Sequence, residues 1–243
     1  MRKEISLPYG KVVFGSLGKK DLTTSLSDVY GFPKSPIEWS NFTKSVLAKE
    51  TNLPSSQITC LNQVHGDQID CVSDSTMEDP GEVPIGDGLY TSQKNQVLVV
   101  RTADCVPVFL HSTKRPFVSV LHSGWKGTKL GITEKMIQTL LDEGDFLEDL
   151  SLEFGPYIQR SNYEVGEDVA TDFQSLGNDV CMPKGNGKFL LDVGLAIETR
   201  VKRQFGDKLQ IRNDHVDVFQ SPLYFSHRAK EEGRNLNFIL WES

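Results

Sequence analysis

The chain reads VLVVRTADC from Val97 to Cys105 and then PFVSVLHSGW from Pro116 to Trp125. In each stretch an apolar run typical of a buried strand leads to a chemically reactive side chain, Cys105 in the first and His122 in the second. Side chains at strand ends lie on loops held by a rigid sheet, where binding and catalytic residues concentrate. A thiol and an imidazole placed this way can act as soft metal ligands or as a nucleophile with its base.

A third residue, His65, follows a strand-like run over residues 58–64. Neutral imidazoles and a thiolate are preferred zinc ligands, and a catalytic zinc keeps three protein ligands and one open position. His65, Cys105 and His122 are therefore candidate ligands, provided that neighbouring strands bring their ends together. Their wide spacing disfavours a closed, finger-like site. From the residues alone, a metal site and a purely structural role are about equally well supported. In the structural role, Cys105 would be an ordinary buried cysteine and the histidines would only form hydrogen bonds.

Strands and helices alternate along the rest of the chain, which predicts an α/β or α+β fold with a mixed sheet. No Pro/Ser-rich linker interrupts this alternation, so we expect one domain over residues 1–243. Strands are expected near residues 12–14, 58–64, 97–103, 106–110, 116–121, 150–154, 209–211 and 236–241, helices over 37–50, 127–142, 165–173 and 190–205, and a loop over 15–26.

Composition narrows the classes of function. A net charge of −7 argues against broad binding to nucleic acid or acidic membranes, because such binding needs clustered Lys and Arg. The four cysteines lie far apart with no CxxC pair, which suits a reducing cytosol. The first residues lack the apolar region of a signal peptide, and no apolar stretch approaches the roughly 20 residues of a membrane helix. These features predict a cytoplasmic protein.

Short motifs also follow one another in a specific order between about residue 58 and residue 240. They are Gln63-Val64-His65-Gly66, Asp87-Gly88-Leu89, Thr102–Pro107, His122–Gly127, Gly155–Ile158, Tyr163–Gly166, Phe225–Arg228 and Gly233-Arg234. This ordered set resembles the YfiH-like family, also called the multicopper polyphenol oxidoreductase or laccase-domain family. The first 55 residues or so match that family poorly.

The resemblance implies a layered α/β sandwich with mixed β-sheets flanked by helices, a fold shared with a deamidating toxin domain. It also implies a zinc site whose Cys/His₂ ligands map onto His65, Cys105 and His122. The activity it implies is phosphorolysis of the purine nucleosides inosine, adenosine, guanosine and methylthioadenosine, together with deamination of adenosine. The partners would then be a purine nucleoside and phosphate.

Further residues in or near these motifs carry suitable chemistry. Phosphorolysis needs an anion site, and Lys126, Arg228 and Arg234 are candidates, against the alternative of solvated surface charge. Asp87 and Asp104 could orient a ligand imidazole, carry a proton or hold a ribose hydroxyl, against the alternative of turn or cap roles. The candidate catalytic set is therefore Cys105, His122, Asp87 and Asp104.

Other functions stay open. In a cysteine hydrolase Cys105 would be the nucleophile and His122 its base, which leaves His65 unexplained. Copper oxidation of phenols fits less well than zinc chemistry, because the chain has five histidines and no His-x-His pair. A divergent zinc-binding homologue could also bind a nucleotide-like or cell-wall precursor ligand without turnover.

The last alternative depends on a departure from the family. Family members carry a Thr-Thr-Arg stretch near the N-terminus, whereas here no arginine stands between Lys3 and Arg101. Lys19 or Lys20 could replace that charge. Of the remaining histidines, His111 is expected at the surface or in a turn and His215 in solvent, and neither is expected to bind metal. His227 is not expected to be a ligand either.

Overall fold

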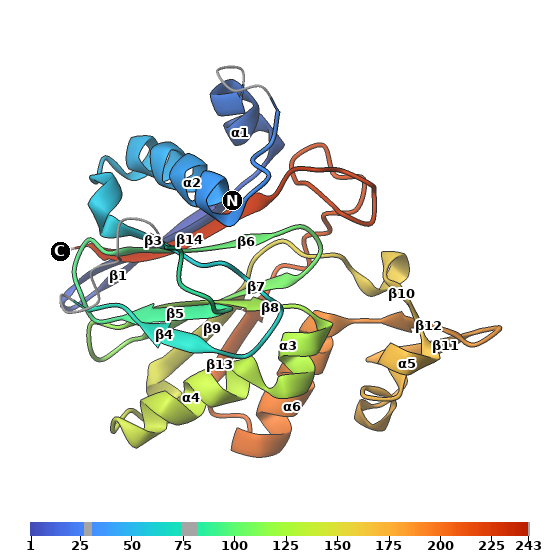
Figure 1. Cartoon of the computed structure of the whole chain (residues 1–243). Helices are drawn as coiled ribbons and strands as arrows, with labels where there is room; N and C mark the ends of the chain where they lie inside the picture. Colours follow the sequence, from blue (N-terminus) through green and yellow to red (C-terminus); the bar gives the residue numbers. More distant parts are fainter. Residues whose placement is uncertain (27–30, 74–81, 243) are drawn as a thin grey trace.

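Two large β-sheets stacked face to face form the centre of the molecule, and helices cover their outer faces (Figure 1). The structure is a computed structural model that describes residues 1–26, 31–73 and 82–242. The layers alternate as helix, sheet, sheet and helix. The predicted layered α/β sandwich with mixed sheets is therefore confirmed. No helix in the described residues is long and apolar enough to span a membrane.

The first sheet has five strands, and its neighbours are antiparallel except for β3 and β6. Its order is β1 (Arg2–Leu7), β2 (Gly10–Leu17), β14 (Asn235–Glu242), β6 (Val97–Thr102) and β3 (Ile58–Cys60). The second sheet has six strands and contains two parallel pairs, β13 with β9 and β4 with β5. Its order is β13 (Gln210–Asn213), β9 (Leu150–Phe154), β7 (Val106–Ser112), β8 (Val118–Ser123), β5 (Gly88–Thr91) and β4 (Ile69–Cys71).

Apolar side chains fill all three spaces between the layers. Between the sheets, Phe14 packs on Phe109 with ring centroids 5.1 Å apart. The outer face of the first sheet is covered by α1 (Lys19–Leu26) and α2 (Pro36–Thr51), and the outer face of the second by α3 (Trp125–Leu130), α4 (Ile132–Asp142) and α6 (Val193–Phe205). Strands buried on both faces read as continuous apolar runs, which is why residues 97–100 and 106–110 contain so few polar side chains.

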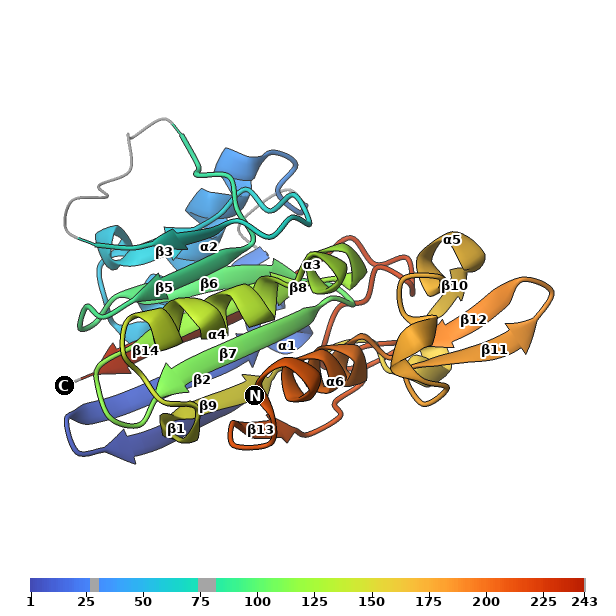
Figure 2. The same cartoon turned by 90° about the horizontal axis from the view of Figure 1, so that it is seen from below.

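A small third sheet projects from one end of this sandwich (Figure 2). Its order is β10 (Glu164–Gly166), β12 (Lys188–Leu191) and β11 (Cys181–Gly185), and the short helix α5 (Glu167–Ala170) follows β10 directly. Single turns of 3₁₀ helix complete the described elements, at Ser55–Gln57, Leu147–Asp149, Arg160–Asn162 and Gln174–Leu176.

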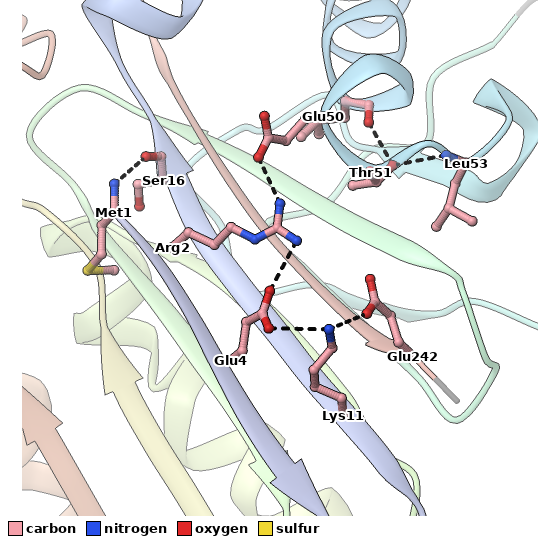
Figure 3. Close-up of polar contacts among 10 residues, drawn as sticks. Met1, Arg2, Glu4, Lys11, Ser16, Glu50, Thr51, Leu53 and Glu242 are labelled. Carbon is pink, nitrogen blue, oxygen red and sulfur yellow. Dashed lines mark hydrogen bonds and ion pairs between the residues drawn. The ribbon is translucent and has the colours of Figure 1, made fainter.

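The N-terminal strand β1 is the edge of the first sheet and carries alternating charges (Figure 3). Arg2 donates to Glu50 on α2 at 2.9 Å and to Glu4 at 3.3 Å. Lys11 bridges Glu4 at 3.2 Å and Glu242 on β14 at 3.0 Å. Charged edge strands resist pairing with other chains. These charges also explain why no strand was predicted there, since β1 lacks an apolar run.

Several expected elements differ from the structure, and each difference has a local cause. The helix expected over residues 127–142 is two helices, because Gly131 adopts a left-handed conformation with φ 80°. The helix expected over 165–173 begins instead as β10, which pairs with β12. The helix expected from residue 190 starts after Asp192, whose carboxylate caps the Leu195 amide at 2.9 Å. The loop expected over 15–26 contains the end of β2 and helix α1.

Candidate metal centre

The three predicted ligands converge at one end of the sandwich. One ligand atom each from His65, Cys105 and His122 lies within 4.8 Å of the other two. The two imidazole rings meet edge to face, with centroids 4.7 Å apart and planes 74° apart. His122 is buried, Cys105 is half-buried and His65 is exposed, so the cluster opens toward the surface at His65.

Strand pairing explains why Cys105 and His122 meet. The chain leaves the first sheet at the end of β6 and enters the second at the start of β7, so Cys105 lies at the crossing between the sheets. Strands β7 and β8 are antiparallel, with Val106 opposite Ser123 and Pro107 opposite His122. Cys105 therefore faces Gly124, where a Cβ atom would lie only 2.8 Å from the Cys105 Sγ atom. The ends of the apolar runs converge as expected, although β6 belongs to the other sheet.

Asp87 connects the two histidine ligands, His65 and His122. Its carboxylate Oδ1 lies 2.7 Å from His122 Nδ1, which leaves Nε2 as the ring nitrogen available to a metal. The same carboxylate accepts backbone N–H bonds from Val64, His65 and Gly66 at 3.2, 3.0 and 2.6 Å. These bonds hold the loop in which His65 has a positive φ of 60°. Asp87 is fully buried, and this position suits the orientation of a ligand rather than contact with a substrate.

Charges within the cluster favour a thiolate. Burial opposes ionisation of Cys105, but the neighbouring His122 and His65 lower the pKa of its thiol to about 6. Burial likewise opposes protonation of His122, but the Cys105 charge and the bond to Asp87 raise its pKa to about 9. In the absence of a metal the cluster is thus a thiolate beside an imidazolium. A metal cation would replace the imidazolium proton as the partner of the thiolate.

Asp104 is held through its carboxylate by two hydrogen bonds to the segment that carries Arg228. Its φ of 97° is unusual for a residue other than glycine. Its carboxylate accepts a bond from Ser226 Oγ at 2.6 Å and another from the Arg228 amide at 2.7 Å. Asp104 therefore fixes the segment that carries Arg228 beside the cluster.

The cluster forms part of the wall of a pocket of about 470 Å³. The pocket is lined by all three candidate ligands, and its other walls combine aromatic rings with arginines. They are Trp39, Gln63, Arg101, Ala103, Asp104, Trp125, Tyr163, His227, Arg228 and Arg234. Two of the three predicted anion-binding residues, Arg228 and Arg234, thus line the pocket. Lys126 is exposed and does not line the pocket, although its ammonium lies 5.5 Å from the centroid of the Trp125 ring.

Arg101 and Trp39 line the pocket although neither was a predicted site residue. The sequence could have indicated a role for Arg101, because it is a lone charge within the apolar run of β6. It gives no such indication for Trp39, which stands at an ordinary helical position in α2. The lysines considered as substitutes for a missing N-terminal arginine do not line the pocket. Lys19 pairs with Glu231 at 2.5 Å and Lys20 is exposed.

The remaining histidines lie apart from the three ligands or at the pocket mouth. His111 was expected at the surface, which is wrong, because it is only 1% exposed between the sheets and stacks near Phe14. It belongs to β7, whose seven residues are all buried. His215 is exposed, as predicted, and His227 is an exposed residue of the pocket lining.

Comparisons with known proteins agree with this fold. The family model described as multi-copper polyphenol oxidoreductase laccase matches residues 41–242. A protein of Rickettsia conorii named purine nucleoside phosphorylase is 30% identical over 199 residues, which are 78% of this chain and 79% of that protein. A protein of Clostridium acetobutylicum with the same name is 31% identical over 186 residues, which are 74% and 75% of the two chains. Among solved structures, YlmD from Geobacillus stearothermophilus has a TM-score of 0.79 at 24% identity and covers 96% of this chain and 92% of that one.

Fold and site together define a layered α/β protein with a Cys/His₂ cluster opening into a pocket. The chain belongs to the multi-copper polyphenol oxidoreductase laccase family, the YfiH-like family that its motifs resemble. Within the described residues the structure contains one group of three metal-binding side chains, namely this cluster. Its donors, two imidazoles and a thiolate with one side facing a pocket, fit a three-ligand metal with an open position.

Proposed function

We propose that this protein is a zinc-dependent purine nucleoside phosphorylase acting on inosine, adenosine, guanosine and methylthioadenosine, with adenosine deaminase activity. The observation that carries the proposal is the joining of the Cys/His₂ cluster, the arginines and the aromatic rings in one pocket. The names of the relatives from Rickettsia conorii and Clostridium acetobutylicum support a nucleoside and phosphate as substrates.

In this proposal His65, Cys105 and His122 hold the zinc, and Asp87 orients His122 through Nδ1. When bound, a zinc with an open position supplies Lewis acidity and lowers the pKa of a bound water to about 7. Copper is the less suitable metal, because a multi-copper oxidase needs several clusters of histidines. Of the five histidines in the chain, His111 is buried between the sheets and His215 is exposed in a loop.

The pocket residues would position the two substrates. Trp125 offers an aromatic ring to a purine, and Arg228 and Arg234 offer guanidinium groups to phosphate. Tyr163 supports Arg228, whose guanidinium carbon lies 5.0 Å from the centroid of the Tyr163 ring. In phosphorolysis a phosphate oxygen attacks C1′ of the ribose while the C1′–N9 bond breaks and the purine leaves. Asp104 would act by holding the Arg228 segment in place, and Lys126 would at most attract phosphate from outside the pocket.

The proposal extends to the organisation and location of the protein. We propose that residues 1–243 act as one domain, because the pocket combines Trp39 near the start of the chain with Arg234 near its end. We also propose a cytoplasmic site of action. None of the four cysteines forms a disulfide within the described residues, which suits a reducing compartment.

The test is incubation of the purified protein with inosine and phosphate, followed by chromatography for hypoxanthine and ribose 1-phosphate. Metal analysis of the same preparation should find about one zinc per chain, and His65→Ala should lose both zinc and product. Adenosine in the absence of phosphate should yield inosine if the deaminase activity is present. A zinc-loaded protein that forms no product above the His65→Ala background would instead support binding of a nucleotide-like or cell-wall precursor ligand without turnover.

The cysteine hydrolase is favoured by one observation, the position of the Cys105 thiol beside two imidazoles, which lower its pKa. Metal removal separates the two functions. A nucleophilic Cys105 would keep its activity without metal and lose it on alkylation with iodoacetamide. A zinc-dependent phosphorylase would lose activity on chelation and regain it when zinc is returned.

A further inference from the structure

Arg101 is held rigidly, yet one of its donors has no partner. Its guanidinium carbon lies 5.5 Å from the centroid of the Trp39 ring, and its Nη2 donates to the Leu61 carbonyl at 2.9 Å. The Arg101 amide also donates to Gln63 Oε1 at 2.7 Å, which fixes the backbone. Nη1 of the same side chain is buried and makes no hydrogen bond. A buried donor without a partner costs free energy, so its presence beside a pocket calls for a ligand.

A second arginine stands beside it. Leu236 of β14 is the direct partner of Arg101 in β6, and Arg234 lies two residues before Leu236. Residues two apart point to the same face of a sheet, so Arg234 is the diagonal neighbour of Arg101. Burial lowers the pKa of Arg101, the nearby Cys60 raises it, and the positive charge of Arg234 lowers it further. Both arginines line the same pocket.

Neither guanidinium has a carboxylate partner within the part of the chain that the structure describes. Arg234 donates only to the carbonyls of Glu232 and Gly233, at 2.9 Å each. Asp104 is the one acidic residue of the pocket lining, and its oxygens are engaged by Ser226 and by the Arg228 amide. Buried charges in proteins are normally paired. A ligand in the pocket would supply the counter-charge that Arg101 lacks.

We propose that Arg101 and Arg234, with Trp39 as the platform for Arg101, form a phosphoryl-binding subsite of the pocket. The inference rests on the proposed function and deepens it by naming residues that hold the anionic substrate. Two guanidinium groups match a group that carries nearly two negative charges at neutral pH and has several acceptor oxygens, which a phosphoryl group provides. That group can come from inorganic phosphate or from the 5′-phosphate of a nucleotide.

The experiment is calorimetric titration of the full-length protein with inorganic phosphate. We expect Arg101→Gln and Arg234→Gln each to weaken phosphate binding at least tenfold. Arg101→Lys should bind phosphate little better than Arg101→Gln, because a lysine lacks the planar group that stacks on Trp39. The matched control is Arg203→Gln, which removes the same charge from an exposed position on α6 and should leave the affinity unchanged. Thermal unfolding of each variant shows whether it is folded. Arg234 lies outside the strands, so Arg234→Gln still tests the subsite if Arg101→Gln fails to fold.

Two further titrants identify the source of the phosphoryl group. If the source is inorganic phosphate, adenosine and phosphate bind together and AMP binds no more tightly than adenosine. If the source is a nucleotide, AMP binds more tightly than adenosine, phosphate competes with AMP, and Arg101→Gln removes the advantage of AMP. Phosphate and AMP affinities that are the same in the wild type and in Arg101→Gln would overturn the subsite.

The subsite and the proposed function can fail separately. Cys105→Ser removes a metal ligand, so it should abolish turnover while leaving phosphate binding intact, which also excludes binding of phosphate through the metal. Arg101-dependent phosphate binding in a protein that cleaves no nucleoside would retain the subsite and reject the phosphorylase. Nucleoside cleavage with the same KM for phosphate in Arg101→Gln would do the reverse.

Discussion

Asp87 Oδ1 lies 2.7 Å from Nδ1 of His122, and both side chains are almost fully buried. The carboxylate also accepts hydrogen bonds from three backbone N–H groups of the loop that carries His65. One side chain thus fixes two of the three candidate ligands. Because Asp87 is sealed from the pocket, its removal should affect metal binding before it affects contact with a substrate.

We expect Asp87→Asn to bind zinc 10–100-fold more weakly than the wild type, which is the usual cost of losing a carboxylate behind a ligand histidine. An amide keeps the size of the side chain but brings an NH₂ group toward backbone donors. Competition with a coloured chelator measures the affinity. Asp142→Asn, at an exposed position whose carboxylate accepts a bond from Gln138, is the control and should match the wild type. Equal zinc affinities for Asp87→Asn and the control would show that Asp87 serves only the loop.

Gly124 should be indispensable to the cluster. An added Cβ would lie 2.8 Å from Cys105 Sγ and 3.4 Å from His65 Cδ2, so at least one ligand must move. Gly124→Ala should therefore lose most of its zinc, as measured by elemental analysis, while circular dichroism shows a folded protein.

Gly144→Ala is the matched control for that variant. Gly144 has a positive φ of 97° and open space around it, so the change adds backbone strain of about 1–3 kcal/mol without touching the cluster. Gly144→Ala should be slightly less stable but fully loaded with zinc. A Gly124→Ala protein that keeps one zinc per chain would mean that the ligands adjust to the added methyl group.

The convergence of the three candidate ligands was predictable because its signal is local. Cys105 and His122 each follow an apolar run, and a run long enough to cross a sheet brings its end to the edge. His65 follows a strand-like stretch over residues 58–64, of which residues 58–60 form β3. The ordered motifs then selected these three from the other histidines. Sequence periodicity does not contain the sheet order, so it could not show that Cys105 lies where the chain crosses from one sheet to the other.

The pocket beyond the trio was harder to predict, because strand pairing creates it. Arg101 and Arg234 become neighbours only through the register of β6 with β14, which joins segments far apart in sequence. Trp39 reaches them because α2 packs on that face of the sheet. His111 was misjudged for a related reason, since a histidine before a Ser-Thr turn resembles a surface residue until β7 is found buried on both faces.

Asp104 offers a test of positioning against proton transfer. Asp104→Asn should raise the KM for phosphate about fivefold to tenfold, because the charged acceptor of the Arg228 amide is lost. Zinc content and the pH profile of kcat should stay unchanged, since the carboxylate carries no proton in this account. Asparagine tolerates the positive φ at this position, so the backbone is kept. A kcat profile that loses its acidic limb in Asp104→Asn would make Asp104 a proton carrier.

His111 should make the fold sensitive to acid. Burial, with a smaller contribution from Arg212, lowers the pKa of His111 from 6.5 to about 4, and its Nδ1 has no partner. Above pH 6.5 the imidazole is neutral in both states and contributes no pH dependence. As the pH falls from 6.5 toward 4, the unfolded chain takes up a proton that the folded chain refuses. The folded state then loses about 3 kcal/mol by pH 4 through this one group.

We therefore expect His111→Phe, which cannot titrate, to lose about 3 kcal/mol less unfolding free energy than the wild type between pH 6.5 and pH 4, as measured by urea denaturation. Contributions from the metal ligands are common to both proteins and cancel in this difference. The control is His215→Asn, because His215 is exposed and asparagine accepts its φ of 52°. It should follow the wild-type pH dependence. If the unfolding free energies of His111→Phe and the wild type fall in parallel with pH, His111 accepts a proton in the folded state, through a partner or water that it gains on protonation.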